Sequence, residues 1–462
     1  MPALSSSPIV AALDHPDVDL DEVIDERGVE PVALSLLDAL AAVPDPRAAR
    51  GVRHGVLAML VVSACAVLAG ARSFVAIAEY AHDEANRIIL DRTGFGPIVP
   101  HESTIRRVLQ ALDPAALEAA LRSWVLAHLT ARRPEAGIPR REHRRVLALD
   151  GKTARGARRA DGSQTHLVSV LDQASGAVLG QVEVDARAPA EVAVDAEVDV
   201  DIEVAAEVDA EHEGTAVTAA GTVAGEDTSD GGTGRAGTRA KGGELGAFTR
   251  LLDPLDLSDV LITADALHTQ RAHACYLHDR GGHYLMTVKA NQPTLLRRLR
   301  ALPWATIGVA ARTRGRGHGR AETRAISVVS LAPCPDGGGE FFPHAAQAIK
   351  LVRRRRSLTG RKWTTVTVYA ITSLTPVEAD PALLARWVQG HWSIENRLHW
   401  VRDVTFDEDR SQVRTAHGPQ VMAALRNITV TAARLAGFTN IAAALRHHAH
   451  DPQRPLATFK IR

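Results

Sequence analysis

Two short apolar runs, each ending in an aspartate, constrain the fold of this chain more than any other feature. Leu-Ala-Leu-Asp150 and Leu-Ile-Thr-Ala-Asp265 are both typical of a buried β-strand with a carboxylate at its end. A third carboxylate, Glu395, lies in a stretch with a helical pattern, 391–400. Carboxylates brought together from two strands and a helix are the ligands that a pair of divalent cations needs for phosphoryl transfer. The sequence therefore predicts an α/β fold that carries a two-metal site.

The order of β-rich and helical patterns predicts which α/β fold this is. We expect strands at 146–150, 165–172 and 177–185, a helix at 246–257, a strand at 260–264, a helix at 269–281 and a strand at 283–288. Further strands are expected at 324–330, 348–353 and 364–372, and helices at 381–399 and 418–436. This order predicts a ribonuclease H-like catalytic core over 145–440, with a β-rich insertion at 290–380 before its last helix.

The N-terminal part of the chain, 34–140, is expected to form an α-helical domain. Its apolar run 55–70 is shorter than the roughly 20 residues of a membrane span, so a buried helix is expected there. Farther along, Ser103 or Thr104 can cap a helix whose first turns carry Arg106 and Arg107. This arrangement is typical of a helix-turn-helix DNA reader, although many helical hairpins share it.

The formal net charge of zero hides segments of opposite sign. Of the 54 acidic and 54 basic residues, 1–30 and 183–240 together hold 23 acidic and only 4 basic ones. The remainder has 50 basic against 31 acidic residues, a net charge of +19. Such an excess is typical of a protein that binds phosphate groups, although it would also arise in any protein from an arginine-rich proteome. We expect 1–33 to be a disordered acidic tail, 186–240 a disordered acidic insertion or a marginal hairpin, and 441–462 a C-terminal tail.

The cysteines and the N-terminal residues indicate the cellular compartment in which the protein is expected. Cys65, Cys275 and Cys334 are far apart and match no zinc-binding spacing, so neither a metal finger nor a disulfide framework is expected. The first residues show no basic region followed by an apolar core, as a signal peptide would. A cytoplasmic protein without a membrane span is the expectation.

Each acidic position also has an ordinary structural explanation. Asp150-Gly is a strong hairpin-turn signal, but a long loop over 151–163 with Lys152 and Arg155 fits a metal ligand beside a phosphate backbone better. Asp265 can cap the helix that follows. Glu395 shares one helical face with His399 and Arg402, as it would on a surface helix. Asp403 is the alternative third carboxylate.

The motifs taken together resemble the ISAs-type (H-repeat-associated) insertion-sequence transposases of the DDE superfamily. The residues that carry the resemblance are Asp150-Gly-Lys-Thr-Ala-Arg-Gly156, Asp265-Ala-Leu-His-Thr-Gln270, Lys289-Ala-Asn-Gln-Pro293, and His391-Trp-Ser-Ile-Glu-Asn-Arg-Leu-His-Trp400 followed by Asp403-Val-Thr-Phe-Asp-Glu-Asp409. Residues 36–83 look like the N-terminal domain associated with this family.

The resemblance implies a catalytic triad of Asp150, Asp265 and Glu395 that holds two Mg²⁺ or Mn²⁺ ions for cleavage and strand transfer. The implied partners are the terminal inverted repeats and target DNA, handled by a homodimer or larger assembly. Lys241 and Glu244 match a family motif of unassigned role. The residues expected to contact DNA are Lys152, Arg155, Arg106, Arg107, Lys289, Arg320 and Arg402. A nuclease on the same fold, or an inactive DNA-binding relic, are the alternatives.

Overall fold

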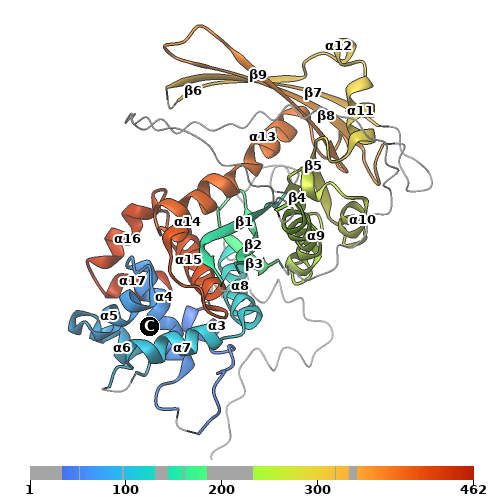
Figure 1. Ribbon diagram of the computed structural model, residues 1–462. Coiled ribbons are helices and arrows are strands. Elements are labelled where there is room, and N and C mark those ends of the chain that lie inside the picture. The colour runs from blue at the N-terminus through green and yellow to red at the C-terminus, as the bar shows by residue number, and fades with distance from the viewer. Residues whose placement is uncertain are drawn as a thin grey trace, which may run out of the picture.

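A nine-stranded mixed sheet runs through the computed structural model, with the strand order β3-β2-β1-β4-β5-β9-β8-β7-β6 (Figure 1). The strands are β1 (Val146–Arg158), β2 (Gln164–Asp172), β3 (Val178–Glu183), β4 (Leu261–Ala264), β5 (His283–Val288), β6 (Ala311–Gly317), β7 (Arg320–Ser330), β8 (Gln347–Ser357) and β9 (Thr364–Thr372). Strands β1, β4 and β5 are parallel neighbours, and the other neighbouring pairs are antiparallel. The expected α/β class is confirmed as a large mixed sheet with helices.

The structure describes residues 34–50, 52–95, 98–130, 144–159, 162–184, 233–317, 319–331 and 341–461. The expected acidic tail 1–33 and most of the expected insertion 186–240 lie outside these residues. Within the described ranges, no helix combines the length and the apolar character needed to cross a membrane.

Alternation along the first strand places hydrophobic cores on both faces of the sheet. Leu147 and Leu149 belong to the largest core, which also holds the N-terminal helices. Val146 points to the opposite face and packs with Leu384 and Trp387 of helix α13 (Pro381–His391). This period of two is what a strand buried on both faces requires. The strand that carries Asp150 is therefore packed against apolar side chains on both faces.

Helices from both ends of the chain form one helical layer at the end of the molecule away from β6–β9 (Figure 1). The N-terminal ones are α3 (Leu36–Leu40), α4 (Val56–Leu68), α5 (Phe74–His82), η1 (Glu84–Asn86), α6 (Arg87–Arg92), α7 (Glu102–Ala111) and α8 (Pro114–Thr130). Helix α4 is buried almost along its whole length, which confirms the expected buried helix at 55–70. It packs against α15 (Gly418–Leu435), which in turn contacts β3.

The expected C-terminal tail is wrong, because residues 441–458 form two helices. Helices α16 (Ile441–Ala449) and α17 (Gln453–Thr458) both contact α4. The backbone amide of Leu36 donates to the carbonyl of Phe459 at 3.0 Å, and the Phe459 ring lies edge-on to Trp124. Apolar residues spaced for a helix face, such as Ile441 and Leu445, explain why this segment folds onto the helical layer.

Other expected boundaries also change. Helix α9 (Thr233–Leu252) begins thirteen residues before the expected start at 246, inside the segment taken as the acidic insertion. The β-rich segment 290–380 adds β6–β9 to the same sheet through β5 and β9, and it also contains α11 (Pro293–Ala301) and α12 (Trp304–Ile307). Strand β6 was not expected, because its sequence is polar and its residues are exposed. The remaining elements near the site are η3 (Ala266–His268) and α10 (Arg271–Asp279).

Candidate functional site

Asp150 and Asp265 lie at the same level of two neighbouring parallel strands. Leu149 of β1 is in register with Ala264 of β4, so the next residue on each chain is one of the two aspartates. Strand β4 ends there, and Oδ1 of Asp265 accepts a hydrogen bond from the amide of Leu267 at 2.9 Å, which caps η3. Asp265 therefore caps a short 3₁₀ turn rather than the helix α10 that follows.

Strand β1, in contrast, continues past Asp150 to Arg158. The expected end of the strand at Asp150 and the expected long loop over 151–163 are wrong, because residues 150–154 pair with β2 in a continuous antiparallel ladder. Asp150 lies opposite Ser169 in this ladder. The carboxylate is thus presented from the middle of a rigid strand and not from a loop.

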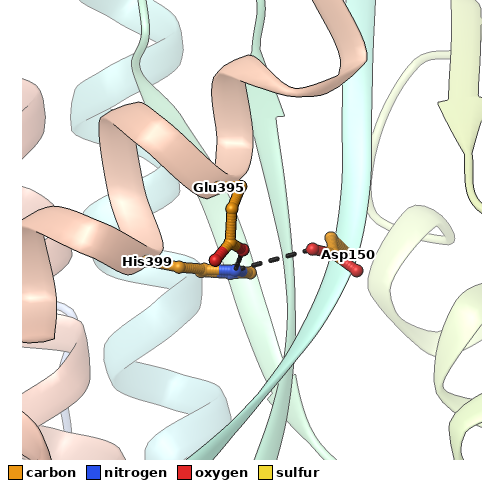
Figure 2. Close-up of side chains that lie close together, drawn as sticks. All are labelled: Asp150, Glu395 and His399. Carbon is orange, nitrogen blue, oxygen red and sulfur yellow. Dashed lines mark hydrogen bonds and ion pairs between the residues drawn. The ribbon is translucent and has the colours of Figure 1, made fainter. Parts of the chain in front are cut away.

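Glu395 faces Asp150 from a local π-helical turn, Glu395–His399, that follows helix α13. Figure 2 shows one nitrogen of the His399 ring directed at both carboxylates. Its Nδ1 lies 2.9 Å from Oε2 of Glu395 and 3.5 Å from Oδ2 of Asp150. Helical spacing predicts that Glu395 and His399 share a face, but the contact of His399 with both carboxylates was not predicted. A π-helical turn inside a helix is rare and frequently marks a functional site.

The surroundings of Asp150 disfavour the charged form of its carboxylate. Burial, and then the neighbouring charges of Asp265, Glu395 and Glu244, raise the pKa of Asp150 to about 7. Glu395 differs, because its hydrogen bond to His399 lowers its pKa. Desolvation lowers the pKa of the buried His399 despite this contact. Negative charges crowded around one half-buried carboxylate are what a bound cation would neutralise.

The donor set fits a hard divalent cation. One ligand atom each from Asp150, Glu395 and His399 lies within 4.8 Å of the others. Carboxylate oxygens are the ligands that Mg²⁺ and Mn²⁺ prefer, and Asp265 stands next to Asp150 to add a further carboxylate. Asp150, Asp265 and Glu395 are therefore the residues present that could hold such ions.

Glu244 is a fourth carboxylate at this site, and no role for it could be predicted from the sequence. It lies on α9 and accepts a hydrogen bond from Nε2 of His166 at 3.1 Å, while Nε2 of His268 lies 3.7 Å away. Burial would raise its pKa, but the two histidines outweigh burial and lower it to about 2. A Cβ atom at position 151 would lie 2.5 Å from Oε1 of Glu244 and 2.8 Å from Nε2 of His166, so any other residue there would have to displace this pair.

A groove of about 700 Å³ opens beside these carboxylates. Glu395 and His399 line it together with the basic residues Lys152, Arg155 and Arg158 of β1. Arg155 is exposed, with 78% of its side chain accessible, whereas Nζ of Lys152 forms a 2.6 Å ion pair with Oδ2 of Asp403. Asp403, the alternative third carboxylate, is therefore engaged by a lysine.

The remaining residues expected to contact DNA lie apart from this groove. Arg106 and Arg107 are exposed on α7, where Arg106 lies 3.5 Å from Glu102 and Arg107 donates to the carbonyl of Ser103. The cap of α7 is His101 rather than Ser103 or Thr104. Lys289 and Arg320 are exposed beyond β5 and at the start of β7. The side chain of Lys241 lies outside the described part of the structure.

The expected contact of Arg402 with DNA phosphate is wrong. Arg402 is fully buried, and its guanidinium forms a bidentate pair with Glu408 at 2.7 and 2.9 Å. Arg426 also donates to Glu408, at 2.8 Å. Burial would raise the pKa of Glu408, but the two arginines outweigh burial and lower it to about 2. This triad anchors the segment after α14 (Trp400–Val404) to α15 and leaves no donor of Arg402 facing solvent.

Comparison with known proteins places the chain in a family. The profile described as "Transposase DDE domain" matches residues 235–431, and the profile described as "DDE_Tnp_1-associated" matches residues 37–125. The two matches together cover more than half of the chain. The chain belongs to the DDE transposases. Asp265 and Glu395 of this DDE transposase lie inside the first match, and Asp150 lies upstream of it.

Curated relatives of the chain are also named as transposases. The chain is 25% identical over 416 residues to the "Putative transposase YncI" of Escherichia coli O157:H7, covering 87% of each protein. It is 23% identical to the "H repeat-associated putative transposase YhhI" of Escherichia coli K12, covering 86% of this chain and 89% of the relative. A solved structure of the piggyBac transposase synaptic complex with hairpin DNA aligns at a TM-score of only 0.34 and 10% identity, over 96% of this chain and 79% of that one.

The raised pKa of Asp150 predicts a pH dependence for the metal-free protein. The folded state holds the Asp150 proton more tightly than the unfolded chain does, since its pKa rises from 3.8 to about 7. The stability linked to this group is thus present below about pH 4 and is lost as the pH rises through about 7. In EDTA, the urea midpoint of the wild type should fall more between about pH 5 and 8 than that of Asp150→Asn.

Mg²⁺ or Mn²⁺ should oppose this loss at the upper pH, because an ion held at this site would bind the deprotonated carboxylate. Parallel pH profiles for the wild type and Asp150→Asn would show that Asp150 does not titrate in this range.

Proposed function

We propose that the protein is an active insertion-sequence transposase that cleaves DNA at the element's ends and joins them to target DNA. The observation that carries the proposal is the juxtaposition of three carboxylates: Asp150 and Asp265 side by side on β1 and β4, and Glu395 facing Asp150. The strand order β3-β2-β1-β4-β5, with the first three antiparallel and the last three parallel, supports a ribonuclease H-like core as their scaffold.

The chain's own residues divide the work in the proposed reaction. Two Mg²⁺ or Mn²⁺ ions held by Asp150, Asp265 and Glu395 would supply Lewis-acid stabilisation of the phosphoryl oxygens and an acidified water or DNA 3′-hydroxyl. His399 orients Glu395 through its 2.9 Å hydrogen bond. Arg155 and Arg158, which line the same groove, hold the phosphate backbone.

The DNA partners follow from the reaction. The terminal repeats are read by the N-terminal helices, where Arg106 and Arg107 are exposed, and Lys289 and Arg320 contact the strand farther out. A homodimer or larger assembly holds the two ends of the element together. Since the substrate is chromosomal DNA, the protein acts in the cytoplasm.

A strand-transfer assay tests this proposal. The full chain is incubated with Mg²⁺ or Mn²⁺, a target plasmid and labelled duplexes that carry the inverted repeats flanking the coding region. We expect cleaved ends and joined products on a denaturing gel, and neither in EDTA. Cleavage without joining would identify a nuclease on the same fold, and binding without cleavage would identify an inactive DNA-binding relic.

A further inference from the structure

A second groove lies between the β6–β8 end of the sheet and the helix that leads to Glu395. Its volume of about 880 Å³ is within the roughly 300–1,000 Å³ typical of ligand pockets. One wall is the face of α13 that carries Arg386 and Gln389, continued by Trp392 and Asn396. The other wall comes from the strands. The groove is separate from the one beside Asp150, since the two share no lining residue.

The lining of this groove is strongly basic. It contains no carboxylate and five arginines: Arg312, Arg324, Arg353, Arg386 and Arg397. Arg312 and Arg386 are exposed, and neither forms an ion pair with another described residue. A groove whose lining gathers five arginines and no carboxylate attracts a polyanion.

Two of the other arginines are held in positions that leave positive charge uncompensated. Arg324 of β7 and Arg353 of β8 are directly opposite each other, an arrangement that destabilises a sheet unless an anion lies between them. They share the single carboxylate of Glu322, at 2.5 and 3.2 Å. One positive charge of this pair therefore remains for a ligand.

Trp392 supplies a flat aromatic surface at the end of the same groove. It follows the last residue of α13, lies three residues before Glu395, and is 60% exposed. Trp387 of the same helix is only 4% exposed and packs in the core. An exposed indole among arginines combines the two elements of single-strand recognition, a stacking platform and a basic track.

We infer that this groove binds an unpaired segment of a DNA strand, with a base stacked on Trp392 and phosphates held by Arg312 and Arg386. Paired bases in a duplex are stacked on their neighbours and cannot offer a face to the indole, whereas unpaired bases can. The inference rests on the proposed function and adds the state of the substrate: the strand is locally single where it passes Trp392, one helical turn from Glu395.

Fluorescence anisotropy of a labelled oligothymidine of about 12 nucleotides, measured in EDTA with the full chain, tests the inference. Trp392→Ala is expected to weaken binding about 5- to 100-fold, the range for loss of one stacked base. Trp392→Phe should recover most of the affinity, because a smaller ring still stacks. Trp400→Ala is the matched control: it is 56% exposed and lines a different groove, so binding should stay within about twofold.

The arginines have a separate readout. The double variant Arg312→Ala/Arg386→Ala should lower the slope of log affinity against log salt by about 1.4, since each lost phosphate contact on a single strand contributes about 0.7. Equal effects of Trp392→Ala and Trp400→Ala, or an unchanged salt slope, would overturn the inference.

The binding assay is run in EDTA, so its outcome does not depend on the metal-dependent cleavage of the proposed function. If the wild type binds the oligonucleotide through Trp392 but never cleaves DNA, the groove stands and the proposed function fails. If it cleaves and joins DNA while Trp392→Ala binds normally, the groove assignment fails alone. Thermal unfolding of each variant confirms that the surface substitutions leave the fold intact.

Discussion

Replacing Asp150 with Asn is expected to reduce metal-dependent DNA cleavage by about a thousandfold or more. A bound cation contributes several kcal/mol of transition-state stabilisation, and each 1.4 kcal/mol corresponds to about a factor of ten in rate. Asp150 is central to the candidate site, because its pKa responds to Asp265, Glu395 and Glu244. Initial cleavage rates on labelled terminal-repeat DNA measure the effect, and Asp265→Asn and Glu395→Gln should reduce the rate similarly.

Asp403→Asn is the control for these substitutions. Asp403 lines the groove beside Asp150 together with Glu395, but its Oδ2 is paired with Nζ of Lys152 at 2.6 Å. Its replacement should reduce cleavage about tenfold or less, through altered positioning of Lys152. A thousandfold loss for Asp403→Asn with little loss for Glu395→Gln would exchange the two residues in the triad. Duplex affinity in EDTA should be nearly equal for all four variants, which separates catalysis from DNA binding.

Glu408→Ala is expected to destabilise the protein by about 3–5 kcal/mol, because it leaves Arg402 and Arg426 buried without their shared carboxylate. Both arginines are at most 2% exposed, so water cannot replace the lost partner without a change of packing. The midpoint of urea unfolding, followed by circular dichroism, measures the loss. The variant should also be less soluble when expressed at higher temperature.

The neighbouring pair Arg410–Asp407 provides the matched control. Its atoms are 3.9 Å apart, and the two side chains are 85% and 40% exposed. Asp407→Asn should therefore change stability by less than about 1 kcal/mol. Asparagine also tolerates the left-handed backbone of position 407, where φ is 54°. If Glu408→Ala unfolds at the same urea concentration as Asp407→Asn, the buried triad does not hold this segment.

Much of the fold could be predicted because its strands are apolar and clearly bounded. Strand β5 occupies the expected range 283–288, and β2 and β4 differ from expectation by a single residue. Prediction failed where backbone pairing is not accompanied by apolar side chains. Beyond Asp150, β1 is polar and basic, yet it pairs with β2 as far as Arg158. The exposed β6 has the same character, and so it was not predicted.

The candidate site could also be predicted only in part. The two aspartates could be predicted as neighbours, since both end apolar strand patterns, and the spacing of Glu395 and His399 placed them on one face. The sequence could not show that Arg402 points inward, because its partner Glu408 lies in a turn whose path depends on tertiary packing. Glu244 was equally hidden, since its contacts, His166 and His268, are 78 and 24 positions away along the chain.

The hydrogen bond between Leu36 and Phe459, and the packing of α16 and α17 on α4, make the covering of an N-terminal helix depend on the last helices that the structure describes. Helix α4 is apolar almost throughout, so a chain without α16 and α17 would expose part of it to water. A polypeptide interrupted before residue 441 would retain all three carboxylates but not a finished helical layer. Such a polypeptide should therefore be impaired first in the helices that are proposed to select DNA.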